Sequence, residues 1–475
     1  SMALGQQASA SAVDATSIGV FTVASGLRST AIGRSADATG QDSTALGADA
    51  QATGLETLAL GQGSNASNTE ASALGRSAAA SGIGSTALGA NAVASATRAH
   101  ALGRNSNATQ TSATAVGANT QATGLESTAL GGGASSLTAA RASGTRSIAI
   151  GGGSSGAAGA LASGSGAIAV GSQSSATTTG SIALGAIANS SGVDAIAVGA
   201  SSSASGAAGA AIGNFSLASG TQSSAFGFGA AATGEYSIGH GRSAWGSGDF
   251  ATAIGFESRA SGASSIAFGQ QTLASGVSSI AIGDQSQATA DGATALGNFS
   301  VASSTQSTAF GFGAAATGDF AMSFGRSAWA SSDLSAAIGF EARASAQSAF
   351  ALGQQSLAAH QNSFAIGTGA TTTGALQIML GTASYSYAMP GLVSAGNKVT
   401  SADFVVVSDL AGNIKTMAMS AFQLTSPDQP EHQNTVQDAQ VAALRAQVTA
   451  QSAELAAMRA EFAALRAELM GEPVA

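Results

Sequence analysis

Glycine recurs at a fixed interval through most of the chain, and this period constrains the fold more than any other feature. A marker glycine occupies every fourteenth position from Gly5 to Gly131 and from Gly171 to Gly381, and the two intervals between Gly131 and Gly171 are longer, at twenty positions each. Each marker closes a phrase such as Ser-Thr-Ala-Ile-Gly33. A fixed internal period predicts a solenoid of stacked units, 26 of them between the first and last markers.

The half-period of seven residues also suits a coiled coil, but glycine excludes a helix here. Each unit divides into halves of the form x-x-Ser-x-Ala-x-Gly, as in 34–40 and 41–47. Glycine in a helix interior costs about 1 kcal/mol relative to alanine, so one or two per unit make a helix unfavourable. Short strands joined by glycine turns fit the same pattern.

In such a strand, the residue before the marker glycine and the residue two positions earlier share one face, with alanine and serine on the other. The column before the marker is apolar at every unit except one, where His240 precedes Gly241. A one-sided apolar column on a two-strand coil predicts a parallel β-roll. Stacked at ~4.8 Å per rung, 26 rungs give a rod roughly 125 Å long.

Composition supports an extended repeat and excludes several classes of function. The chain of 475 residues has 64 glycines, 9% charged residues and a net charge of −9. Its lack of a basic stripe argues against a nucleic-acid partner. With no cysteine, it has no thiolate catalyst, disulfide or cysteine zinc site. The alanine-rich interior buries little apolar surface, so we expect several rolls to pack side by side.

The two longer intervals and a second, longer repeat predict further features of the rod. The extra six residues in each of the two longer intervals fall in the Gly/Ser/Ala-rich first half of the unit, so we expect adjacent outward loops without a binding role. A longer repeat is superimposed, because 214–297 recurs six units later as 298–381. The duplicated segment holds nearly all aromatic residues of the rod, while residues 1–212 contain only Phe21.

The aromatic half is therefore the candidate for ligand contact. Phenylalanines such as Phe226, Phe268 and Phe310 simply replace isoleucine in the stacking column. Large amphipathic rings beside arginines on a plain surface are typical contact residues. The candidates for ligand contact are Trp245, Trp329, Tyr236, Phe320, Arg242 and Arg326, with Arg259 and Arg343 nearby.

The period ends after Gly381, and the composition predicts four further segments. Residues 382–426 form a small connector, in which a β-run from Phe404 leads to an Ala-Gly-Asn turn before Ile414. Residues 427–433 form a linker bounded by prolines, 434–469 a coiled coil and 470–475 a tail. The head is thus 1–381.

A heptad pattern free of Gly and Pro predicts the parallel coiled coil. Glutamates at g and arginines at e five residues later pair neighbouring helices and set their orientation. Three strands are preferred over two, although the heptads alone do not decide. The residues expected to mediate trimerisation are Val441, Leu444, Val448, Gln451, Leu455, Met458, Phe462, Leu465 and Leu469, and the interchain ion pairs are Glu454 with Arg459 and Glu461 with Arg466.

The repeat phrase Ser-x-Ala-(Ile/Leu/Val)-Gly resembles the head repeat of YadA-like trimeric autotransporter adhesins, and the connector and coiled coil resemble their neck and stalk. The resemblance implies a homotrimeric, left-handed parallel β-roll on the bacterial surface or outside the cell. It implies attachment to host matrix, other cells or abiotic surfaces, as in biofilms. We recognise no secretion signal or four-strand membrane anchor, so we expect no direct membrane insertion by this chain.

We predict no enzymatic activity, cofactor or metal. The matches to catalytic and nucleotide motifs within 151–156 lack the strand-loop-helix setting that those chemistries need. The histidines His100, His240, His360 and His432 are too dispersed to chelate within one chain. His240 is expected to be a hydrogen-bonded structural residue, with three copies converging on a metal or anion as the alternative.

Two other functions also fit a trimeric rod or a flat repeat face. A phage tail fibre or appendage subunit uses similar β-rods and coiled coils. An ice-binding solenoid is a remote alternative, because its threonine ladder would be interrupted by other residues.

Overall fold

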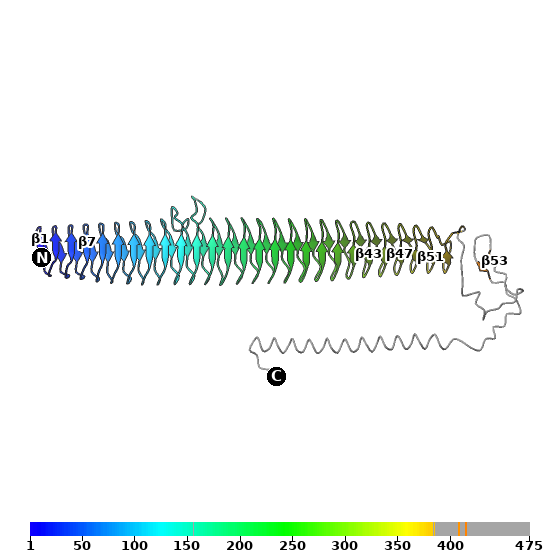
Figure 1. Ribbon diagram of the computed structural model, residues 1–475, viewed down its shortest axis with the longest axis horizontal. Helices are drawn as coiled ribbons and strands as arrows, with labels where there is room; N and C mark the ends of the chain where they lie inside the picture. Colours follow the sequence, from blue (N-terminus) through cyan, green and yellow to red (C-terminus); the bar gives the residue numbers. More distant parts are fainter. Residues whose placement is uncertain (155, 383, 385–406, 409–413, 416–475) are drawn as a thin grey trace, which may run out of the picture. The chain divides into compact units, whose positions relative to one another are not determined.

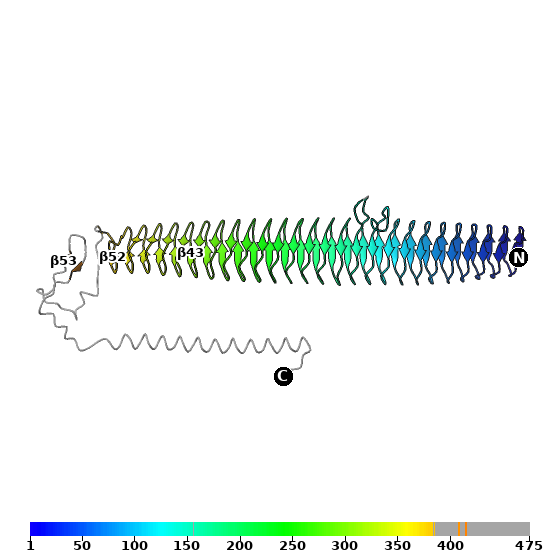
Figure 2. The same cartoon turned by 180° about the vertical axis from the view of Figure 1, so that it is seen from behind.

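The computed structural model describes residues 1–154, 156–382, 384, 407–408 and 414–415. The chain separates into two units, Ser1–Tyr385 and Ser386–Ala475. The first unit is a long parallel β-solenoid that forms a straight rod (Figure 1), and the same rungs are seen from behind in Figure 2. Its described residues contain no helix. The predicted all-β repeat solenoid is therefore confirmed.

Each rung before Gly367 contains one long and one short strand. The long strands have three residues and end just before a marker glycine; they are the odd-numbered strands from β1 (Met2–Leu4) to β51 (Phe364–Ile366), followed by β52 (Ile378–Leu380). The short strands have two residues and are the even-numbered strands from β2 (Ser9–Ala10) to β50 (Leu357–Ala358). They begin four residues after the marker glycine, or ten after it in the two long rungs.

Strands of one kind pair in parallel with their counterparts in the next rung. The long strands form a single 27-stranded sheet. In β31 (Ser224–Phe226) and β33 (Ile238–His240), for example, Phe226 lies opposite His240. This register keeps equivalent residues in columns along the rod, so a column can be read from the sequence by taking every fourteenth position.

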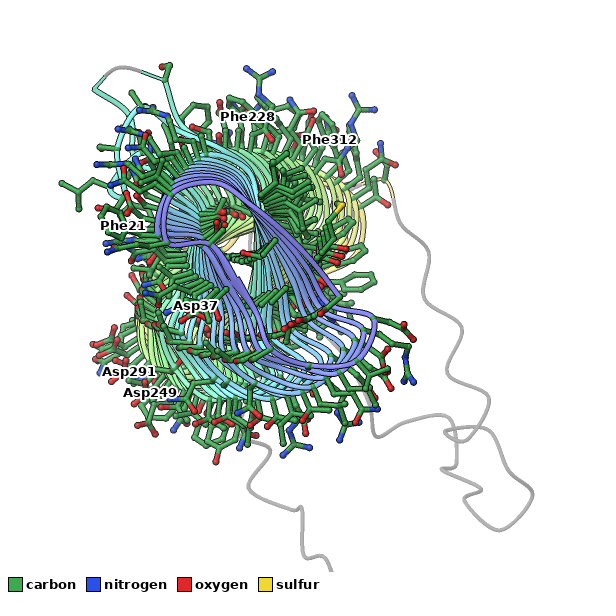
Figure 3. All side chains as sticks on the ribbon, turned by 90° about the vertical axis from the view of Figure 1, so that its left-hand side faces the viewer. Phe21, Asp37, Phe228, Asp249, Asp291 and Phe312 are labelled. Atoms are coloured by element: carbon green, nitrogen blue, oxygen red, sulfur yellow. The ribbon has the colours of Figure 1, made fainter. Side chains whose placement is uncertain are left out.

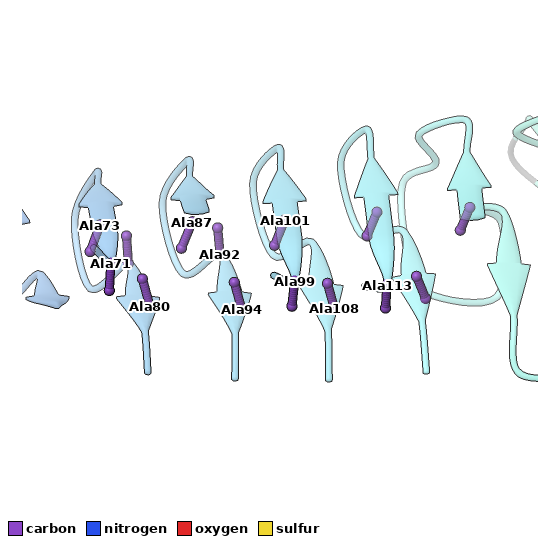
Figure 4. Close-up of a cluster of buried hydrophobic side chains, with 14 of the residues drawn as sticks. Ala71, Ala73, Ala80, Ala87, Ala92, Ala94, Ala99, Ala101, Ala108 and Ala113 are labelled. Carbon is purple, nitrogen blue, oxygen red and sulfur yellow. The ribbon is translucent and has the colours of Figure 1, made fainter. Parts of the chain in front are cut away.

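The interior of the roll is filled by four small side chains per rung. Ala31 from a long strand, Ala36 and Ala38 from the next stretch and Ser43 from the second turn each have 0% exposure. Figure 4 shows these alanine columns continuing from rung to rung. The buried serine donates its hydroxyl to Gly40 O at 2.6 Å, so its polar atom is satisfied locally.

The marker glycine is required by both backbone conformation and space. Gly33 has a φ of 130°, which other residues rarely adopt, and a Cβ there would lie 2.5 Å from Gly47 O in the next rung. Alanine or any larger residue at this position would force adjacent rungs apart. The glycine period therefore reports the close stacking of the turn that follows each long strand.

In the rungs of fourteen residues, two further positions adopt left-handed backbone without needing glycine. They lie two and nine residues after the marker, in the first and second turns, as at Phe21 (φ 59°) and Arg28 (φ 54°). Even Ile187, a β-branched residue, has a φ of 61°. The stacked backbone thus imposes this conformation on residues with no intrinsic preference for it.

The extra residues of the two long rungs form loops that leave the rod at the first turn. They follow Gly131 and Gly151, and the chain rejoins the roll where Ala140 N donates to Gly131 O at 2.9 Å and Ala160 N donates to Gly151 O at 2.8 Å. Both loops project from the same side of the rod in Figures 1 and 2. The expected adjacent outward loops are present.

In the second unit, the structure describes one antiparallel pair, β53 (Val407–Ser408) with β54 (Ile414–Lys415). This pair lies within the expected connector. The linker 427–433, the coiled coil 434–469 and the tail 470–475 lie outside the described residues, as do all the trimerisation and interchain ion-pair residues predicted from the heptads.

Candidate functional surfaces

An exposed apolar surface runs along the outer face of the long-strand sheet. We call it the apolar stripe; it consists of the side chains immediately before each marker glycine and, where apolar, those two residues earlier. Leu88 is 45% exposed, Phe226 56% and Phe310 51%. Because the central residue of each long strand points inward, its two neighbours must point outward. Large exposed apolar patches on soluble proteins often mark interaction sites, which makes the stripe a candidate interaction surface.

One polar residue, His240, interrupts the column before the marker glycines. Its Nε2 lies 2.9 Å from Ser224 Oγ, and its ring packs edge-on against Phe226 at 6.0 Å between centroids. Burial lowers the pKa of His240 below its ordinary value. Within the chain, His240 is thus a hydrogen-bonded residue of the stripe. The described residues hold no group of three or more side chains placed to bind a metal.

The two tryptophans lie on the opposite side of the roll, on the outer face of the short strands. Trp245 in β34 (Trp245–Gly246) pairs with Arg259 in β36 (Arg259–Ala260), and the guanidinium carbon lies 5.8 Å from the ring centroid. The duplicated segment repeats this contact with Trp329 and Arg343, also at 5.8 Å. Both tryptophans are 46% exposed.

A second set of aromatic and arginine residues occupies the first turn, just after the marker glycines. Arg242 lies 5.5 Å from the Phe256 ring. In the duplicated segment Arg326 lies between two rings, 5.8 Å from Phe312 and 5.7 Å from Phe340. Such cation-π contacts hold an arginine side chain in place while leaving its outer edge open to solvent.

The second turn carries the remaining predicted aromatic residues. Tyr236 stacks on Phe250 with 5.0 Å between centroids, and Phe320 is 51% exposed. Carboxylates share this edge: Asp249 Oδ1 accepts a hydrogen bond from Glu235 N at 2.9 Å. In the axial view of Figure 3, Phe228 and Phe312 lie at one edge of the roll, and Asp249 and Asp291 lie at another.

The structure thus separates the residues predicted as one ligand-contact group. The tryptophans lie on the short-strand face, Arg242 and Arg326 on the adjoining first turn, and Tyr236 and Phe320 on the second turn. Sequence reasoning missed Phe256 and Phe340, whose signal is that each follows Arg242 or Arg326 by one repeat unit.

Among the described residues, ion pairs join Arg28 to Asp42 and Arg34 to Asp49. The four arginines beside the aromatic rings of the duplicated segment form none with described carboxylates. In the same part of the chain, no helix has the length and hydropathy needed to cross a membrane.

Comparison with known proteins shows which family the chain belongs to. The model of the YadA head domain repeat matches more than half of the chain, over residues 1–78, 80–134, 138–154, 162–186, 218–238, 247–272 and 274–370. Among solved structures, the chain is similar to the collagen-binding domain of the Yersinia adhesin YadA, with 30% identity and a TM-score of 0.25, over 35% of this chain and 81% of that one. No curated protein matches.

The repeat matches lie on the β-roll itself, in both halves of the rod and on both copies of the duplicated segment. They include many rungs of the apolar stripe and, in the second copy of the duplication, the residues Arg326, Trp329, Phe340 and Arg343, while Arg242 and Trp245 lie between two matched segments. This protein therefore belongs to the family of YadA-like trimeric autotransporter adhesins, and its rod is an adhesin fibre with YadA-type head repeats.

Proposed function

We propose that three copies of this chain form a parallel homotrimeric rod whose apolar stripes face one another around a common axis. The observation that carries this proposal is the stripe itself, with side chains such as Leu88 and Phe226 about half exposed in the single chain. The interior alanines bury little surface of their own. Covering the stripe supplies the apolar burial that a thin roll lacks.

Cyclic symmetry fits the placement of the stripe. A ring of three identical chains uses a head-to-tail contact in which one edge of each chain meets the opposite edge of the next. The long-strand sheet faces the axis, its two turn edges approach neighbouring copies, and the short-strand face remains outside. The heptads at 434–469 support the same stoichiometry, with Val441 to Leu469 forming the seam and Glu454–Arg459 and Glu461–Arg466 pairing between chains.

We assign the trimer a non-enzymatic function at the bacterial surface or in the extracellular space. Membership of the adhesin family supports this localisation. The partners proposed are host matrix, other cells or abiotic surfaces. A rod with many equivalent rungs suits attachment by repeated weak contacts, whose combined strength comes from multivalency.

The contact residues for attachment are proposed to lie in the aromatic half of the rod. Trp245 and Trp329 lie on the short-strand face that a trimer leaves exposed. Arg242 and Arg326 lie on the first turn, and Tyr236 and Phe320 lie on the second. Both turns approach neighbouring copies, so we assign these four residues a weaker role in ligand contact than the tryptophans.

Antibody labelling of intact source cells, with culture fluid and virus particles probed in parallel, tests the proposed function. Label on the cell envelope or between cells is expected, together with loss of attachment to matrix-coated and plastic surfaces when the gene is deleted. Label confined to virus particles would identify the rod as a viral appendage instead.

A further inference from the structure

We propose that the outer face of the rod carries two copies of a binding site for acidic polysaccharides, built from paired arginine and aromatic side chains. The first copy consists of Arg242, Trp245, Phe256 and Arg259, and the second of Arg326, Trp329, Phe340 and Arg343. We call these the arginine–aromatic clusters. This inference rests on the proposed adhesive function and names the ligand class that these residues recognise.

Each cluster is an alternating arrangement over two adjacent rungs. In the rung of Gly241, Arg242 on the first turn precedes Trp245 on the short strand; in the next rung the order is reversed, with Phe256 followed by Arg259. Each arginine therefore contacts an aromatic ring in the neighbouring rung, at 5.5 Å for Arg242 and 5.8 Å for Arg259. The cluster thus consists of two arginine–aromatic pairs from the same two rungs, Trp245 with Arg259 on the short-strand face and Arg242 with Phe256 on the adjoining first turn.

The second cluster reproduces this arrangement one duplication later. Arg343 lies 5.8 Å from Trp329, and Arg326 lies 5.7 Å from Phe340. The repetition shows that all four residues of the cluster recur together at the same positions of the rung. Six rungs separate the clusters, which places them ~29 Å apart along the rod.

The guanidinium groups remain available for an anion. None of the four arginines forms an ion pair with a described carboxylate. The nearest acidic residue in sequence, Glu257, accepts a hydrogen bond from Gln271 Nε2 at 2.9 Å, and Glu341 accepts one from Gln355 Nε2 at 3.0 Å. Both glutamates are thus engaged by the following rung.

The side-chain chemistry favours acidic sugars over other polyanions. A planar guanidinium binds carboxylate or sulfate through two parallel hydrogen bonds. An exposed indole or phenyl ring offers a flat apolar surface on which the C–H face of a sugar ring stacks. Nucleic acid is less suited, because tracking a phosphate chain needs a continuous basic stripe, which the chain lacks.

The position of the clusters suits a polymer lying along the rod. The tryptophans and their arginines occupy the face opposite the apolar stripe, so trimer formation leaves them exposed. A chain long enough to span ~29 Å engages both clusters of one copy, and binding at the second then becomes intramolecular. Binding of long chains should therefore be much tighter than binding of fragments that reach only one cluster.

Binding of immobilised full-length protein to heparin, hyaluronan and neutral dextran tests the inference. Heparin carries sulfate and carboxylate groups, hyaluronan carboxylate alone, and dextran neither. We expect binding to one or both acidic polymers, weakened at least tenfold by Arg259→Gln with Arg343→Gln and by Trp245→Ala with Trp329→Ala. Replacing one cluster alone should abolish the advantage of long chains over short fragments.

Arg76→Gln with Arg104→Gln is the matched control, because these arginines occupy the same rung position as Arg242 in the half of the rod without aromatic clusters. This variant should bind as the wild type does. Equal loss in the control, equal binding of dextran, or absence of binding to both acidic polymers would overturn the inference. The molar mass of each variant, measured in parallel, shows whether the trimer is intact and so separates failure of the site from failure of the assembly.

Discussion

His240 Nε2 lies 2.9 Å from Ser224 Oγ within a face that is otherwise apolar. The equivalent residue in the second copy of the duplication is Phe324, which stacks on Phe310 at 5.8 Å. Six rungs further along the rod, the position equivalent to His240 thus carries an apolar side chain. At this position the first copy carries a titratable side chain and the second does not, so only the first should respond to pH.

Acidification should destabilise the rod through His240. Burial lowers the pKa of His240 in the folded state below the unfolded value of about 6.5. Between these two values the unfolded state binds more protons, so stability falls as the pH is lowered through this window. Thermal unfolding between pH 7.5 and 5.5 should show this fall in the wild type and a smaller one in His240→Phe. An unchanged slope in the variant would contradict the assignment.

The opposite dependence applies to Asp37, on the outer face of a short strand. Its Oδ1 is buried without a hydrogen-bond partner, and burial raises the pKa of the carboxyl group. The folded state therefore binds more protons than the unfolded state between pH ~3.9 and the raised pKa, and stability falls as the pH rises through that window.

Asp37→Asn should consequently raise the melting temperature at pH 7, because it removes the partly buried charge. Asn65 and Asn107 already occupy equivalent positions in other rungs, so the fold accepts the amide. The gain should shrink below pH ~3.9, where the aspartate is protonated in both states. A gain that persists unchanged at low pH would refute the electrostatic explanation.

The alanine interior should reject larger side chains. Ala101 is fully buried and lies opposite Ala87 and Ala115 in the adjacent long strands. Ala101→Leu should destabilise the rod by about 1–3 kcal/mol, the usual range for overpacking a filled core. Ala79→Leu is the control, because this outward position holds leucine in other rungs, such as Leu161. Urea unfolding should separate the two variants, and equal stability would contradict the packing argument.

Relief of backbone strain should stabilise the protein at Ile187. Its φ of 61° lies in the left-handed region, where an L-residue costs roughly 1–2 kcal/mol and asparagine is better tolerated than a β-branched residue. Ile187→Asn should therefore gain about 1 kcal/mol. Ile187→Val keeps the β-branch and should gain nothing. Differential scanning calorimetry of the two variants checks the prediction.

Asparagine already serves this position in other rungs. Asn91 Nδ2 donates to Asn105 Oδ1 at 3.1 Å, and Asn105 Nδ2 donates to Asn119 Oδ1 at 2.9 Å. The ladder ends where Asn119 Nδ2 donates to Gly133 O at 2.8 Å, at the first of the two long loops. Stacked amides thus stabilise the turn in the rungs that precede the first loop.

The repeat period predicted the β-roll, its strands and its outward loops because steric exclusion requires glycine at each marker position. A Cβ on Gly33 would clash with Gly47, so each close contact of this kind requires a glycine that is visible in the sequence. The left-handed position two residues after the marker glycine has no such residue preference, so the sequence does not reveal it. Residues as different as Phe21 and Ile187 occupy it, because stacking imposes the conformation on whatever is present.

The candidate contact residues were only partly predictable. Their aromatic and basic character selected Trp245, Arg242 and Tyr236 as candidates from the sequence, but not their placement, because Tyr236 lies on the second turn and Arg242 on the first. In a solenoid, residues one repeat unit apart in the sequence are neighbours in adjacent rungs, so this spacing predicts side-chain contacts better than proximity along the chain does. That spacing connects Arg242 to Phe256 and Trp245 to Arg259.

The central claim is that copies of the rod meet through the apolar stripe, and cysteine cross-linking tests it most directly. The chain has no native cysteine, so Leu88→Cys provides one thiol on the stripe and Gln51→Cys one on the short-strand face. A molar mass of three chains is predicted for both variants. Mild oxidation should produce interchain disulfides from Leu88→Cys and few from Gln51→Cys. A molar mass of one chain, or equal cross-linking from the two positions, would contradict the account.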